Sequence, residues 1–283
     1  MYPHPIERSS KSIQVLYRLL LPVSLFIWLL PLLAVAVTSV RSQADITRGN
    51  ILGWPSDFQI IANYVSVFTE SEFAYYLMNS IKVSVPSALL AVGVASLAGY
   101  TLAVHRIRIA TPLFFLFLAG NFVPFQILLV PVRNLSLATG LYDTATGLVL
   151  CHVAFQIGFC ALVTRNFIKT IPFELIETAR LDGVGEFQIF SRVILPLIKP
   201  ALAAALVLVF TFVWNDFFWA TALTQSADTR PITAAVQSLN GQFVSRYHLV
   251  SAASLLAALP PVLLFFLMQK HFTAGLTLGA RKG

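Results

Sequence analysis

Six long apolar runs constrain this chain more than any other feature of its sequence. A helix needs about 20 mostly apolar residues to cross the hydrocarbon core of a bilayer. Six runs of roughly this length follow one another, at residues 19–40, 83–104, 112–131, 144–163, 201–223 and 249–268. With 57% hydrophobic residues and a mean hydropathy of +0.79, the chain has less polar surface than a soluble protein of 283 residues needs. The sequence therefore predicts an all-α polytopic membrane protein with six transmembrane helices.

The Lys and Arg residues predict how these helices are oriented. The run at 19–40 is too long for the core of a signal peptide and has no obvious small-residue cleavage site, so we expect a retained helix. If the N-terminus is cytoplasmic, thirteen of the 19 Lys and Arg residues fall on cytoplasmic segments, five fall outside, and Lys82 lies near a boundary. Cytoplasmic loops carry such an excess. Both termini are therefore predicted to be cytoplasmic. Because the bases are dispersed, the net charge of +7 does not predict nucleic-acid binding.

The connecting segments predict one integral membrane domain over residues 1–283. The longest outer segment, 41–75, contains Gly, Pro and polar residues suited to turns and a short surface helix. The tail at about 269–283 is polar, and by itself its "GLTLGARKG" end predicts a flexible, solvated terminus. The two cysteines have no metal-binding spacing, so no metal site is predicted.

The connection at about 166–199 differs from the others. It is about 35 residues long, and connections of that length are usually functional or disordered. Its apolar residues recur too often for disorder. Pro172 suits the first turn of a helix and Gly183 can end that helix in a left-handed conformation, while Pro196 predicts that a second helix stops before it. The segment is predicted to form two short helices at the cytoplasmic face. Periodicity alone leaves open whether they bind a partner or lie on the membrane as an amphipathic hairpin.

The stretch "ETARLDG", followed by "VILP", resembles the EAA signature of permease subunits of binding-protein-dependent ABC importers. That signature reads Glu-Ala-Ala, three residues, Gly, nine residues, then Ile, one residue and Leu-Pro. Thr178 stands where the signature has Ala, and Val193 where it has Ile. "PVRNLSLATGLYDTATGLVL", "FVWNDFFWA" and "FTAGLTLGARKG" are similar to the carbohydrate branch, specifically the maltose-transporter type of second permease. The residues that match the signature at its spacing are Glu177, Ala179, Gly183, Leu195 and Pro196.

This resemblance implies the ABC type I importer permease fold in a bacterial plasma (inner) membrane. It implies a second permease subunit, a cytoplasmic ABC ATPase dimer, an extracytoplasmic solute-binding protein and a carbohydrate substrate. The chain contains no GxxxxGK[ST] phosphate-binding loop, so we expect no cofactor here and ATP with Mg²⁺ on the partner ATPase subunits. The chain is not expected to be an enzyme.

The resemblance also implies that the segment at about 166–199 docks in a cleft of the ATPase, and that the tail reaches down between the ATPase subunits. A helix pair held by Gly183 can behave as a rigid lever, while Glu177 and Arg180 offer charged contacts and Ala179 allows close approach. The candidate ATPase-coupling residues are Glu177, Thr178, Ala179, Arg180, Asp182, Gly183, Leu195 and Pro196.

Polar residues within the apolar runs are candidates for the substrate path. An ionisable group in a bilayer, such as Asp216, is a functional candidate, although a hydrated interfacial position or a bond to a neighbouring helix is an alternative. Trp214 suits stacking on a sugar and equally an interfacial aromatic belt. His152 and Gln156 are expected to bond between helices. The resemblance implies that the companion permease holds most substrate contacts. The candidate substrate-path residues are Asn121, Gln126, Trp214, Asn215 and Asp216.

Two other classes of protein agree less well with the sequence. A secondary carrier or channel would not need a large cytoplasmic docking segment, and the runs hold few charges for ion coupling. A membrane enzyme would need an acid–base pair, whereas Asp216 is the one carboxylate available in the runs. Among importers, a glycerol phosphate-like ester or another small polar solute is the alternative cargo.

Overall fold

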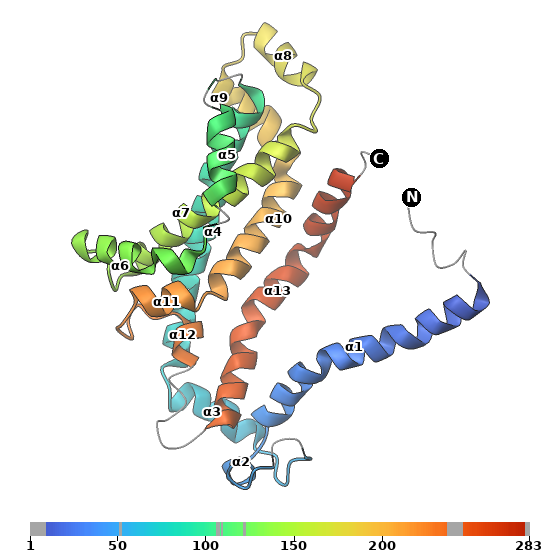
Figure 1. Cartoon of the computed structure of the whole chain (residues 1–283), viewed down its shortest axis with the longest axis vertical. Coiled ribbons are helices and arrows are strands. Elements are labelled where there is room, and N and C mark those ends of the chain that lie inside the picture. Colours follow the sequence, from blue (N-terminus) through green and yellow to red (C-terminus); the bar gives the residue numbers. More distant parts are fainter. Residues whose placement is uncertain are drawn as a thin grey trace. The chain divides into compact units, whose positions relative to one another are not determined.

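A computed structural model describes residues 10–50, 53–105, 108, 110–120, 123–236 and 246–280 (Figure 1). Within these ranges the regular structure is helical, apart from one isolated antiparallel bridge between Arg41 and Phe58. The chain divides into two compact units, Met1–Ser71 with Leu239–Leu256, and Glu72–Ser238 with Ala257–Gly283. The single membrane domain expected over 1–283 stays a prediction.

Five helices of the described chain are long and apolar enough to cross a membrane. They confirm an all-α, multi-span architecture, and each covers all or most of one of the predicted runs, with the third run as the exception. The helices are α1 (Lys11–Ser39), α4 (Phe73–Val104), α7 (Ala145–Ile168), the continuous helix from Glu186 through α10 (Leu195–Trp214), and α13 (Tyr247–Ala280).

The third predicted run, 112–131, is not one helix, and that part of the prediction is wrong. α5 (Ala110–Gly120) covers its first part, and η2 (Phe125–Leu128) and α6 (Leu129–Ala138) follow. Pro124 has an extended backbone with ψ of 114°, and proline itself cannot donate the hydrogen bond that a continuous helix requires. The count of six spans and the cytoplasmic termini stay predictions.

The fifth run and the tail also differ from the prediction. α10 ends at Trp214, and α11 (Phe218–Leu223) and α12 (Ile232–Val236) follow, so the run 201–223 is interrupted rather than continuous. α13 continues to Ala280, so residues 269–280 are helical, which corrects the expectation of a flexible end there. Residues 281–283 lie outside the described residues.

In the first unit, the segment after α1 folds around two buried charges. One short surface helix was predicted here, and the structure has two short helices, α2 (Gln43–Thr47) and α3 (Ile60–Thr69). Arg41 is fully buried and donates to the carbonyl oxygens of Asn50, at 2.5 Å, and Gly53. Asp45 accepts from the backbone N–H and the hydroxyl of Ser56, at 2.8 and 2.6 Å. Those bonds lower the pKa of Asp45. They also tie Ser56 to Asp45, which keeps this segment compact.

The second unit is built on close packing of α4 against α7 and α10 (Figure 1). Small residues recur every four positions on α4, at Ser87, Ala91, Ala95 and Gly99, and the first three are fully buried. Such a row lets helix backbones approach each other. A Cβ on Gly99 would lie 2.8 Å from Cβ of Thr164 on α7, closer than real side chains pack.

Gly99→Leu is therefore expected to destabilise the second unit by about 2 kcal/mol, because overpacking a tight interface forces helices apart. The thermal unfolding midpoint of the purified protein in detergent measures this effect. Gly93→Leu is the matched control, since a Cβ at Gly93 meets no atom within 4 Å. Equal midpoints for the two variants would contradict the close α4–α7 contact.

Candidate functional site

The segment at 166–199 begins with a short helix that ends in a Schellman motif. α8 (Glu174–Leu181) is followed by Gly183, whose φ of +75° lies in the left-handed region. The Gly183 N–H donates to Arg180 O and the Val184 N–H to Ala179 O, both at 3.0 Å. This pair of bonds satisfies the last carbonyls of the helix, and glycine adopts the required φ without cost. The predicted glycine turn is therefore confirmed.

The second helix of this segment does not end before Pro196, and that prediction is wrong. α9 (Glu186–Gln188) continues as a π-helix, η3 (Ile189–Ile194), directly into α10. Pro196 occupies the first turn of α10. A π-turn shifts each donor to a carbonyl five residues away, so the helix passes the missing proline N–H without ending. The segment is thus joined rigidly to a long apolar helix.

A buried apolar cluster holds this segment against α4. Ile176 of α8 is 2% exposed and Ile189, at the start of the π-helix, is fully buried. Together they bury one face of each short helix, which fixes α8 to the helices beside it. The buried residues of this cluster are Tyr100, Val104, Ile168, Ile176, Ile189, Phe190, Ile194 and Ile198.

Glu186 links α8, the second helix and α4 in one polar cluster. Its Oε1 accepts from Arg180 Nε at 2.7 Å, and its Oε2 accepts from the Tyr100 hydroxyl at 2.7 Å. His105 Nε2 lies 3.4 Å from the same Oε2. Glu186 was not among the predicted coupling residues. The sequence shows an acid at the start of a helix, but not that Tyr100 and His105 return to it from the far end of α4.

The opposite face of the segment exposes large apolar side chains. Leu181 is 88% and Phe187 is 73% exposed. The predicted coupling residues are distributed over both faces of the segment. Glu177, Thr178, Asp182, Gly183 and Pro196 are exposed, and Ala179, Arg180 and Leu195 are partly buried.

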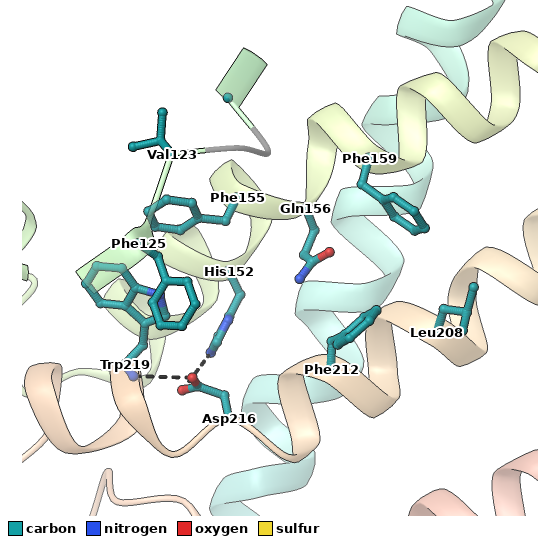
Figure 2. A pocket seen from close by; sticks show the side chains of 11 residues that line it. Val123, Phe125, His152, Phe155, Gln156, Phe159, Leu208, Phe212, Asp216 and Trp219 are labelled. Carbon is teal, nitrogen blue, oxygen red and sulfur yellow. Dashed lines mark hydrogen bonds and ion pairs between the residues drawn. The ribbon is translucent and has the colours of Figure 1, made fainter. Parts of the chain in front are cut away.

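A second candidate site is a cavity of about 600 Å³ where α7, α10 and α11 meet the segment after α5 (Figure 2). Its polar lining comes from His152 and Gln156 of α7 and from Asp216, which lies between α10 and α11. The rest of the wall is largely aromatic. The aromatic side chains that line it are Phe125, Phe155, Phe159, Phe212 and Trp219.

Asp216 is placed by the break between α10 and α11. Its carboxylate accepts from the backbone N–H groups of Trp219, at 3.3 Å, and Ala220, at 2.9 Å, and so caps α11. His152 Nε2 lies 3.6 Å from Asp216 Oδ2, and both side chains are largely buried. The interruption of the fifth run is therefore what turns Asp216 toward α7.

Gln126, Trp214 and Asn215, which were also predicted for the substrate path, do not line this cavity. Trp214 is buried, stacks on Phe210 and donates its indole N–H to Ala257 O of α13 at 2.9 Å. Asn215 is exposed beside the break and Gln126 is exposed on η2. Asn121 lies outside the described residues. The structure adds His152 and Gln156, which were expected to bond between helices, and Trp219.

Asp143 fixes the far end of α11 from outside the spans. Its backbone N–H donates to Leu223 O at 2.9 Å, and its carboxylate accepts from the N–H of Gln225 and the hydroxyl of Thr229, at 2.8 and 2.5 Å. Burial raises the pKa of Asp143, but these bonds and those from Ser226 outweigh it and lower the pKa to about 2.

Since the folded pKa of Asp143 is depressed, its contribution to stability is present above the ordinary value of 3.8 and is lost as pH falls toward 2. We expect the amides of Gln225 and Ser226 to exchange faster over that pH range, after correction for intrinsic exchange rates. In Asp143→Asn, these two amides are expected to exchange fast already at pH 7 and to show no further increase in exchange as the pH falls. Hydrogen–deuterium exchange measures both, and an unchanged acid step in the variant would contradict the assignment.

Comparisons with known proteins agree with this architecture. The family model described as "Binding-protein-dependent transport system inner membrane component" matches residues 10–277. The lactose transport system permease protein LacG of Rhizobium radiobacter is 31% identical over 90% of this chain and 92% of its own length. The melibiose/raffinose/stachyose import permease protein MelC of Bacillus subtilis is 31% identical over 90% of this chain and 91% of its own.

Among solved structures, a bacterial ABC transporter involved in the import of the acidic polysaccharide alginate shares the fold. Its TM-score is 0.80 at 23% identity, with 96% of this chain and 99% of that chain covered. The family consists of transport permeases and not of enzymes, and its members are multi-pass inner membrane proteins. A model that matches nearly the whole chain shows that this protein belongs to the family of binding-protein-dependent transport system inner membrane components.

Proposed function

We propose that this chain is a permease subunit of an ATP-driven importer that receives a sugar or oligosaccharide from an extracytoplasmic solute-binding protein. Half of the translocation path would come from this chain and half from a second permease. The names of LacG and MelC, which match over nearly their whole length, support a carbohydrate cargo. Both termini and the segment around Gly183 would face the cytoplasm, in agreement with the distribution of Lys and Arg.

The observation that carries this proposal is the two-faced segment from α8 to η3. One face is anchored by Ile176 and Ile189, and the other exposes Leu181 and Phe187. Exposed apolar side chains on short helices suit a groove on a partner protein. Because η3 runs directly into α10, a push on the exposed face would move a membrane-spanning helix.

The source of energy would be a separate ATPase dimer. The chain lacks a phosphate-binding loop, so ATP and Mg²⁺ would bind on that partner. The coupling residues predicted from the sequence would then contact the ATPase, through exposed groups such as Glu177 and Asp182, with the exposed Leu181 beside them.

Reconstitution tests this function. The full complex is purified with its ATPase and second permease and inserted into liposomes that contain ATP, and uptake of radiolabelled lactose, melibiose, raffinose and maltose is measured. We expect at least one sugar to accumulate only when ATP and the binding protein are both present. ATP-independent uptake, or failure to accumulate any of the four sugars, would contradict the proposed function.

A further inference from the structure

We infer that the cavity beside Asp216 is a sugar-binding subsite within this permease subunit, where one ring of the cargo rests during passage. This inference rests on the proposed function, and it assigns to this chain a contact that resemblance alone gives to the companion permease. It is carried by the cavity's size, its aromatic wall and the unused hydrogen-bonding capacity of its polar groups.

The size and lining of the cavity suit a small ligand. Pockets for such ligands hold about 300–1,000 Å³ and combine apolar walls with a few converging polar groups. This cavity holds about 600 Å³ and has the side chains of His152, Gln156 and Asp216 among five aromatic rings. Figure 2 shows His152 and Gln156 projecting from α7 toward Asp216 and Phe212.

The aromatic wall is pre-organised. Phe155 and Trp219 stack at 5.1 Å with an interplanar angle of 23°, and Phe125 packs near the same Trp219 ring at 6.5 Å. Trp219 is itself 4% exposed, and its backbone is held by the Asp216 cap. A sugar ring has an apolar C–H face as well as hydroxyl groups, and a rigid aromatic surface offers that face a dry contact.

The polar groups retain capacity for hydroxyl groups. An ionised carboxylate offers about four lone-pair positions. The backbone N–H groups of Trp219 and Ala220 occupy two of those on Asp216, and His152 Nε2, 3.6 Å from Oδ2, faces a third, which leaves about one position for a ligand hydroxyl. The Gln156 side chain makes no hydrogen bond within the part of the chain that the structure describes, although it lines the cavity. An amide that both donates and accepts, beside a carboxylate that accepts, matches the hydroxyl groups of an uncharged sugar.

The charge of Asp216 argues against a phosphate ester as the preferred ligand. A second anion near this carboxylate would be repelled, and the described residues that line the cavity include no Lys or Arg to compensate. The subsite would therefore favour neutral hydroxyl-rich rings over anionic solutes.

Photoaffinity labelling of the full complex tests the subsite. The probe is a diazirine derivative of whichever of the four sugars the complex accumulates, and labelled peptides are mapped by mass spectrometry. We expect labels on the α7 peptide around Phe155 and on the α11 peptide around Trp219. Gln156→Ala is expected to lower labelling there about five-fold, as expected for a lost hydrogen-bonding group, and Asp216→Asn about ten-fold.

Leu150→Ala is the matched control, because Leu150 lies on α7 and is 48% exposed away from the cavity. Co-purification of the ATPase confirms that each variant assembles. Should the complex transport a sugar whose probe does not label α7 or α11, the subsite would be overturned while the proposed function stands. The subsite would also be overturned, and the proposed function would stand, if Gln156→Ala and Asp216→Asn assemble and are labelled as strongly as Leu150→Ala. Failure to transport any of the sugars would overturn both.

Discussion

Replacing Gly183 with valine is expected to lower ATP-driven uptake about ten-fold while the complex still assembles. Gly183 has φ of +75°, where a left-handed backbone costs an ordinary L-residue roughly 1–2 kcal/mol and a β-branched residue is a rare outlier. A Cβ there meets no atom within 4 Å, so the effect comes from the backbone and not from a clash. The Schellman motif that sets α8 against the second helix would open, and the exposed face would no longer be held rigidly.

The measurement is uptake by reconstituted liposomes, normalised to the amount of ATPase that co-purifies. Gly185→Val is the matched control, since Gly185 has an extended backbone with φ of −69° and ψ of 151°, which valine adopts easily, and it too has open space around it. Uptake by Gly183→Val equal to that of Gly185→Val would show that the turn does not transmit force.

Glu186→Arg is expected to uncouple the complex, so that ATP is still hydrolysed but uptake falls by an order of magnitude. The change replaces the acceptor for Arg180 and Tyr100 with a cation beside Arg180 and His105. Arg180 and Glu186 are partly exposed, so the ion pair alone contributes little, about 0–1 kcal/mol. The larger effect arises because one residue joins α8 to α4, and its loss lets the exposed face move without α4.

The ratio of sugar transported to ATP hydrolysed measures this uncoupling. Tyr100→Phe removes a single hydrogen bond of the cluster and is expected to lower the ratio only about two- to three-fold. The double variant Arg180→Glu with Glu186→Arg restores the opposite charges and is expected to recover part of the ratio. A Glu186→Arg complex with the wild-type ratio would exclude the Glu186 cluster from coupling.

The general architecture could be predicted because it depends on local patterns. Apolar runs predict spanning helices, and the φ that Gly183 needs follows from where a helix must stop. The positions at which helices end or are interrupted were harder to predict from the sequence. Pro196 predicted an end to the second helix, but a π-turn lets the helix continue without the proline N–H. Residues Asn215–Phe217 interrupt the fifth apolar run, although its hydropathy predicts one continuous helix.

The candidate sites were predicted in part, for a physical reason. Asp216 stood out as a lone carboxylate among apolar residues. Trp214, two residues earlier, was also a candidate for the substrate path, but its indole N–H donates to Ala257 O instead. Which of these two side chains faces the cavity depends on the angle between α10 and α11, which no local pattern encodes. Glu186 was missed similarly, because its partners Tyr100 and His105 are brought to it only by helix packing.

Photocrosslinking from Phe187 tests the central claim most directly. A benzophenone amino acid replaces Phe187 in the full complex, membrane vesicles are illuminated, and the crosslinked partner is identified by mass spectrometry. Because Phe187 is 73% exposed on the face opposite the α4 contacts, we predict that the crosslinked protein is the ATPase. Crosslinks confined to lipid, or to a protein on the outer side of the membrane, would contradict the account.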